Sequence, residues 1–126
     1  MAHVLIVDDT ADSRIVLAKF LTYAGHEVED APNGREALRM ILTRTPDLLV
    51  LDLMMPEMDG PSLLEILRSY LRLRTLPVIV WTAYADNTAA DRAISLGVSA
   101  LLSKEQATFA DINRIIGEEL SRPRQN

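Results

Sequence analysis

Short apolar runs alternate five times with amphipathic stretches along this chain, and this alternation limits the possible folds more than any other feature. The runs at 4–7 and 48–51 contain no polar residue, which is typical of strands covered on both faces of a sheet. Strict alternation of strands with helices predicts a parallel sheet with helices on both faces and right-handed crossovers. The sequence therefore predicts an α/β fold.

Three more strands complete the predicted sheet. The segment 27–30 is short and polar apart from Val28, which suits an edge strand, and further apolar runs lie at 78–81 and 100–102. Because Trp81 alternates with Thr82 along its strand, we expect the two side chains on opposite faces and the indole packed in the core.

Five helices are expected between and after the strands. Gly25 and Gly97 mark the ends of the first and fourth helices, and the fourth covers 86–96. Asn33 with Glu36 and Thr108 with Asp111 have cap spacing, and Pro61 suits a first helical turn. The residues expected to face the core are Ile15, Val16, Phe20 and Leu21 in the first helix; Ala37, Leu38, Ile41 and Leu42 in the second; Leu64, Leu67 and Leu71 in the third; and Ile112, Ile115 or Ile116, and Leu120 in the last.

Length and composition exclude several classes of protein. The 126 residues suit one domain, expected at 1–121, followed by a polar tail at 122–126. With no cysteine, a disulfide framework and a thiolate metal site are excluded. The uncharged stretches are too short to cross a bilayer and no signal peptide is evident, so we expect no membrane contact and a cytoplasmic location. The net charge of -5, with one basic cluster at Arg68, Arg72 and Arg74, argues against direct nucleic-acid binding.

Polar residues follow four of the predicted strands at the point where each ends. Asp8 and Asp9 follow the first strand, Asp52 the third, Thr82 the fourth and Lys104 the fifth. In open parallel sheets, ligands bind beyond the carboxyl ends of the strands, so these side chains are expected to meet at one edge. Two aspartates alone would suit an ordinary solvated edge, but five groups supplied by separate strands favour a functional site.

The chemistry of this edge predicts a hard cation. Carboxylates packed closely repel one another and raise one another's pKa unless a cation joins them. Oxygen ligands without histidine or cysteine suit Mg²⁺ or Mn²⁺, which also keep several waters and bind phosphate oxygens.

Four stretches together resemble the receiver domain of two-component response regulators: VLIVDD at 4–9, DLMMPEMDG at 52–60, Thr82-Ala83, and 97–104. The resemblance covers roughly 3–120. It implies a flavodoxin-like, three-layer αβα sandwich with a five-stranded parallel sheet in the order 2-1-3-4-5 and five helices. It also implies a signalling domain of the kind that single-domain chemotaxis regulators represent.

The resemblance assigns a role to each residue of the predicted edge. Asp52 looks like the phosphoacceptor, and Thr82 and Lys104 look like the groups that hold the phosphoryl oxygens. Asp9 looks like a direct ligand of Mg²⁺ (or Mn²⁺), Asp8 a ligand acting largely through water, and Asp52 and the Met54 backbone carbonyl the remaining ligands.

The function that the resemblance implies is phosphotransfer signalling rather than metabolic catalysis. A sensor histidine kinase or a phosphotransfer protein would donate the phosphoryl group, and the domain would catalyse its own phosphorylation and a slow dephosphorylation. Met54 and Tyr84, which flank the path of an attacking water in this family, offer no acid or base. The changed surface would signal to a downstream protein, or form a homodimer, through the fourth helix, fifth strand and fifth helix.

Two positions depart from the family pattern and keep an alternative open. Leu101 stands where receivers usually carry an aromatic residue, and Glu105 where they carry a proline in a cis peptide. A cis bond before a non-proline residue costs about 2.5–4 kcal/mol, so we expect a trans peptide there. The alternative is a receiver-like domain that binds partners without phosphorylation. A small aspartyl phosphatase fits less well, because Asp52 lacks the usual second aspartate two residues later.

Overall fold

Five parallel strands form one sheet in the computed structural model, which describes residues 2–83 and 87–123. The strand order is β2-β1-β3-β4-β5, so β1 and β3 lie side by side in the middle. The strands are β1 (His3–Val7), β2 (Glu27–Ala31), β3 (Leu48–Leu51), β4 (Val78–Thr82) and β5 (Ala100–Ser103). The helices are α1 (Ala11–Tyr23), α2 (Gly34–Thr43), α3 (Gly60–Ser69), a 3₁₀ turn η1 (Leu71–Leu73), α4 (Asn87–Ser95) and α5 (Phe109–Leu120).

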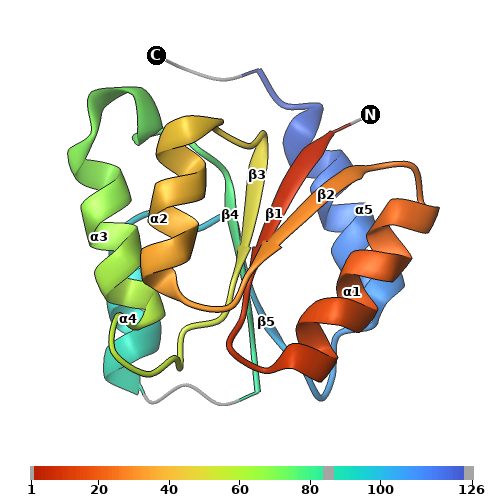
Figure 1. The fold of residues 1–126 in the computed structure, drawn as a ribbon, viewed down its shortest axis with the longest axis horizontal. Coiled ribbons are helices and arrows are strands. Elements are labelled where there is room, and N and C mark those ends of the chain that lie inside the picture. The colour runs from red at the N-terminus through yellow and green to blue at the C-terminus, as the bar shows by residue number, and fades with distance from the viewer. Residues whose placement is uncertain (1, 84–86, 124–126) are drawn as a thin grey trace.

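Helices cover both faces of this sheet. Figure 1 shows α2, α3 and α4 on one face and α1 and α5 on the other, with all strands ending at the same edge. The predicted α/β sandwich and its strand order are therefore confirmed. Asp86, the expected start of the fourth helix, and 124–126 of the expected tail lie outside the described residues. No helix in the described part of the chain is both long and apolar enough to span a membrane.

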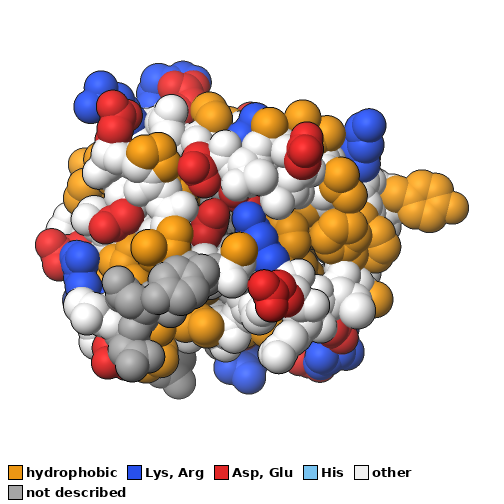
Figure 2. All heavy atoms as spheres, turned by 90° about the horizontal axis from the view of Figure 1, so that it is seen from below, with side chains coloured by type: hydrophobic (Ala, Val, Ile, Leu, Met, Phe, Trp, Pro, Cys, Tyr) orange, Lys and Arg blue, Asp and Glu red, His pale blue; other side chains and the backbone are white. Residues whose placement is uncertain are grey.

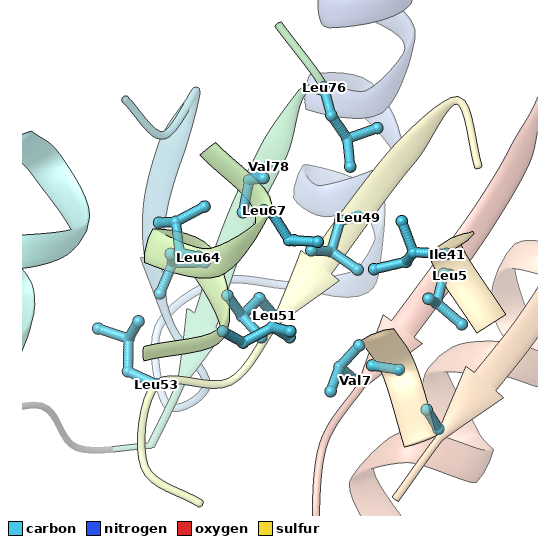
Figure 3. Close-up of a cluster of buried hydrophobic side chains, with 14 of the residues drawn as sticks. Leu5, Val7, Ile41, Leu49, Leu51, Leu53, Leu64, Leu67, Leu76 and Val78 are labelled. Atoms are coloured by element: carbon cyan, nitrogen blue, oxygen red, sulfur yellow. The ribbon is translucent and has the colours of Figure 1, made fainter. Parts of the chain in front are cut away.

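The sheet divides the hydrophobic core into two clusters. Leu5 and Val7 of β1 point to the side of α2 and α3, and Val4 and Ile6 point to the side of α1 and α5. This alternation is the ordinary period of a strand, and it explains why the run 4–7 is apolar at every position. Figure 3 shows the first cluster, in which side chains of β1, β3 and α3 interlock.

The predicted helix caps are present. The Asn33 side chain accepts a hydrogen bond of 2.8 Å from the amide of Glu36, and Thr108 forms a reciprocal capping box with Asp111. Gly97, two residues after the end of α4, has a positive φ of 84°, a conformation that favours glycine, as the prediction of a helix end there requires. These local signals fix where the helices begin and end.

The predicted inner face of α1 is wrong in part. Leu17 and Leu21 are fully buried, whereas Ile15 and Val16 are 44% and 49% exposed. A helix turns by about 100° per residue, so Ile15 lies on the side opposite to Leu17. Apolar residues occur all round this helix, and their spacing alone does not reveal which of them face the core.

The predicted inner faces of α2 and α3 also need correction. Leu42, near the end of α2, is 37% exposed, and Leu71 is 77% exposed. The helix α3 ends at Ser69, and Tyr70 has extended backbone angles before the short turn η1. This break removes the spacing of four between Leu67 and Leu71, and Leu73 takes the buried position instead.

The basic residues of this region do not form a patch on one helix. Arg68 lies on α3, but its guanidinium donates hydrogen bonds of 2.9 and 2.8 Å to the carbonyls of Leu96 and Gly97 and one of 2.8 Å to that of Leu73. Burial lowers the pKa of this guanidinium from its ordinary value. Arg68 therefore ties the end of α4 to α3 and η1.

Gly60 provides a test of how tightly the loop after β3 is packed. A Cβ atom at Gly60 would lie 2.6 Å from both the Asp52 carbonyl oxygen and the Leu53 Cα. We expect Gly60→Ala to lower the free energy of unfolding by about 2–3 kcal/mol, since backbone atoms would have to move. Gly117, inside α5, has open space around it, so Gly117→Ala should raise stability by about 0.5–1 kcal/mol. Urea unfolding checks both, and equal effects would contradict this packing.

Candidate functional site

The carboxyl ends of β1, β3, β4 and β5 bring the predicted site residues together. β1 pairs with β3 in a register that places Val7 beside Leu51, so Asp8 and Asp52 follow at the same level. β4 and β5 pair Thr82 with Ser103, which puts Lys104 one residue beyond the strand. Figure 2 looks onto this edge, where acidic and basic side chains meet near the middle of the face.

Asp8 is buried, and bonds on several sides hold it in place. Its Oδ1 accepts a hydrogen bond of 2.8 Å from the amide of Thr10, and its own amide donates to the Ala31 carbonyl at 3.2 Å. The guanidinium of Arg14 donates to the Asp8 carbonyl at 2.8 Å and to Asp30 at 2.8 Å. Asp9, the next residue, is exposed to solvent.

Asp52 is a buried carboxylate with an oriented side chain. Its Oδ1 accepts hydrogen bonds from the Thr82 hydroxyl at 2.7 Å and from the Met54 amide at 3.2 Å. Its amide donates to the Val7 carbonyl at 2.9 Å, which continues the ladder between β1 and β3. Burial raises the pKa of Asp52 above its ordinary value, although the bond from Thr82 and the charge of Lys104 oppose this effect.

Lys104 supplies the positive charge of the site. Its Nζ lies 2.6 Å from Asp8 Oδ2 and 3.6 Å from Asp52 Oδ2. Its amide donates to the Thr82 carbonyl at 2.9 Å, so the backbone position of Lys104 is tied to β4. The ammonium offsets only part of the negative charge, because three carboxylates and one ammonium leave two negative charges.

The donor set fits a divalent cation. Asp8, Asp9 and Asp52 each offer an oxygen, and these oxygens lie within 4.8 Å of one another. Oxygen-only ligands suit Mg²⁺ and Mn²⁺, and a divalent ion would match the two uncompensated negative charges. Asp9 is open to water, which suits an ion that retains part of its hydration shell.

Met54, another predicted position, lies at a cavity of about 240 Å³. Met54 lines it together with Asp9, Asp52, Thr82 and Lys104. The Met54 amide points to Asp52, and its side chain is exposed. Tyr84 lies outside the described residues.

The two departures from the family pattern are both visible. Leu101 is 39% exposed on β5, and no cis peptide occurs in the described part of the chain, so the peptide between Lys104 and Glu105 is trans as expected. Sequence reasoning missed the role of Arg14. Arg14 follows Asp9 by five residues, a distance at which α1 can turn it back toward the loop, but its partner could not be inferred.

The buried charge of Asp52 predicts that its removal stabilises the protein when no metal is bound. In EDTA, Asp52→Asn should raise the free energy of unfolding by about 1 kcal/mol, because the amide accepts the Thr82 bond without the cost of a buried charge. A raised folded-state pKa means that wild-type stability is lost as the pH rises through that pKa. The difference from Asp52→Asn should therefore be small near pH 4 and grow toward pH 7 in thermal unfolding, and a constant difference would contradict it.

Comparison with known proteins agrees with this geometry. The family model of the response regulator receiver domain matches residues 4–116. The chain is 41% identical over 101 residues to the "uncharacterized 14.6 kDa protein in sodA1 3'region" of Leptolyngbya boryana, covering 80% of this chain and 77% of that protein. It is also 41% identical over 99 residues to the DNA-binding transcriptional regulator NtrC of Klebsiella pneumoniae, covering 79% of this chain and 21% of that protein.

A solved structure shows the same fold throughout. The signal receiver domain of a signal transduction histidine kinase from Syntrophus aciditrophicus superposes with a TM-score of 0.86 at 32% identity, covering 96% of this chain and 91% of that one. The family match extends from β1 into α5, and so includes all the strands that supply the acidic edge. With this fold and this edge, the chain belongs to the family of response regulator receiver domains.

Proposed function

We propose that this receiver domain accepts a phosphoryl group on Asp52 from a sensor histidine kinase or a phosphotransfer protein. Receiver domains are signalling domains of two-component systems, and the proposal assigns this chain the phosphorylation-dependent form of that activity. The observation that carries it is the buried, oriented Asp52 carboxylate within 3.6 Å of Lys104 and 2.7 Å of the Thr82 hydroxyl. The proposal includes a cytoplasmic location, where ATP-dependent kinases act.

The proposed reaction is an in-line displacement at phosphorus. A carboxylate oxygen of Asp52 forms a bond to phosphorus while the bond from phosphorus to the donor, a histidine nitrogen, breaks. The electron pair of that bond leaves with the imidazole, and the product is an acyl phosphate. The bonds from Thr82 and Met54 to Oδ1 orient the carboxylate before attack. Lys104 then balances charge on the phosphoryl oxygens.

Asp8, Asp9, Asp52 and the Met54 backbone carbonyl would hold Mg²⁺, or Mn²⁺ in its place. The bound ion supplies positive charge against the phosphoryl oxygens as the two anions approach. Without such a charge, Asp52 and an anionic phosphodonor repel one another within a site that already has two uncompensated negative charges. Since no acid or base is present at Met54, the acyl phosphate should hydrolyse slowly.

The signal would leave the site when Thr82 exchanges partners. Its hydroxyl now donates to Asp52, and a phosphoryl oxygen would offer a better charged acceptor. The surface formed by α4, β5 and α5 is the proposed contact for a downstream protein or a second copy of the chain. Ile94 on α4 is 61% exposed there and Leu101 on β5 is 39% exposed. Exposed apolar side chains at neighbouring elements favour a protein contact.

The acceptor assignment can be tested by intact mass. With Mg²⁺ and acetyl phosphate, the wild type should gain one phosphoryl group, and Asp52→Asn should gain none. Thr82→Ala should still gain it, because the hydroxyl is not the nucleophile. Asp9→Asn should require a higher Mg²⁺ concentration, and EDTA should abolish the reaction in every variant.

Asp12→Asn is the matched control, since it removes an exposed carboxylate from the first turn of α1. It should behave as the wild type does. A mass gain in Asp52→Asn would move the acceptor elsewhere. Failure of the folded wild type to react would favour the alternative, a domain that binds its partners without phosphorylation.

The proposed contact surface can be tested by sedimentation velocity. If α4, β5 and α5 form a dimer contact after phosphorylation, Mg²⁺ with beryllofluoride should shift the wild type toward a dimer. Ile94→Glu should prevent the shift, because it places a charge in the apolar contact. Tyr23→Glu, on the exposed end of α1, is the control. A wild type that stays monomeric would leave a different protein as the partner of this surface.

A further inference from the structure

The only tryptophan of the chain lies against the charged group of the site. Lys104 Nζ stands over the indole ring of Trp81, 5.0 Å from its centroid. Trp81 is buried, as predicted. The sequence did not predict its contact with Lys104. The negative face of an aromatic ring attracts a cation at this distance. The indole thus faces the same ammonium that binds Asp8 at 2.6 Å.

The sheet places these two side chains on the same face. Trp81 belongs to the core cluster on the side of α1 and α5, as does Leu102 of β5, which is its register partner. Lys104 follows Leu102 by two residues and so points to that side too. Leu101 alternates with Leu102 and points to the other face of the sheet. The contact between Lys104 and Trp81 therefore lies on the opposite face of the sheet from Leu101, the position where other receivers carry their aromatic residue.

The indole is held by packing rather than by a hydrogen bond. Its Nε1 is buried and has no hydrogen-bond partner in the described part of the chain. Its ring meets Phe109 edge-on, with centroids 6.0 Å apart and an interplanar angle of 67°. Phe109 in turn meets Phe20 of α1 at 5.5 Å. Three aromatic rings thus connect Lys104 with the first residue of α5 and with α1.

We propose that Trp81 is a positioning residue for Lys104 and that, through Phe109, it transmits movement of the ammonium to the first turn of α5. The indole occupies one side of the Lys104 ammonium, and the carboxylates of Asp8 and Asp52 lie within reach of the rest of it. A phosphoryl group on Asp52 draws the ammonium away from Asp8, and the contact with the ring changes. The transmission half rests on the proposed function, whereas the positioning half does not.

The positioning half can be measured in the metal-free wild type by proton NMR. The chain has two lysines, Lys19 and Lys104, and Lys19 is exposed on α1. Protons above an aromatic face are shifted upfield, so the ε-methylene signal of Lys104 should lie upfield of that of Lys19. Trp81→Leu should move the signal to the position of Lys19, and Trp81→Phe should keep part of the shift. Coincident signals in the wild type would overturn the positioning role.

The kinetic consequence separates positioning from general packing. With Mg²⁺ and acetyl phosphate, Trp81→Leu should be phosphorylated about tenfold more slowly, a loss between those of an exposed and of a fully desolvated cation–π contact. Trp81→Phe should recover most of the rate, because a ring face remains. When the wild type is phosphorylated, equal rates for Trp81→Leu and the wild type, or equal losses in both variants, would overturn the proposal.

The transmission half is tested by hydrogen exchange at 109–113 with and without Mg²⁺ and beryllofluoride. The wild type should change its exchange rates there, and Phe109→Leu should lose that change while still gaining the phosphoryl mass on Asp52. No change in the wild type would overturn the transmission. If the wild type gained no phosphoryl mass but showed the upfield Lys104 signal, the proposed function would fail and the positioning role would stand.

Discussion

Repulsion among three carboxylates within 4.8 Å of one another is the constraint on which the rest of this structure depends. Two of the three are buried, so water screens them poorly. They stay together because Asp8 and Asp52 follow neighbouring strands, and the backbone amides of both residues still donate to carbonyls of the sheet. Lys104, fixed to β4 through its own amide, offsets part of the charge. The site is thus an energetically costly arrangement maintained by a rigid sheet.

The alternation of strands and helices could be predicted from the sequence, whereas the buried faces of three helices could be predicted only in part. The alternation of apolar runs with amphipathic stretches predicted the number and the ends of the strands, and the caps at Asn33 and Thr108 were local signals. The strand order was implied by the resemblance to receiver domains. In α1, apolar residues lie all round the helix, and in α3 the extended backbone at Tyr70 ended the pattern early. Which apolar residue is buried is decided there by tertiary packing.

The grouping of the site residues could also be predicted from the sequence, whereas some of their contacts could not. The five polar residues could be grouped because each lies at the carboxyl end of a strand or within two residues of it, and strand ends of a parallel sheet meet at one edge. The contacts of Arg14 with the Asp8 carbonyl and of Lys104 with Trp81 could not be inferred, because they depend on how far long side chains reach. Alternation placed Trp81 in the core correctly, but no periodic pattern shows that its ring meets a charge.

Arg68 has a mechanical consequence for α4. Its guanidinium binds the carbonyls of Leu96 and Gly97, so the carboxyl end of α4 is clamped to α3. Because this end of α4 is held, a change in the orientation of the helix displaces its amino end more than its carboxyl end. The nine residues of α4 give the helix a length of about 13 Å. The amino end of α4 follows Thr82 by five residues in the sequence, so a displacement of Thr82 would reach α4 at the end that lies farthest from Arg68.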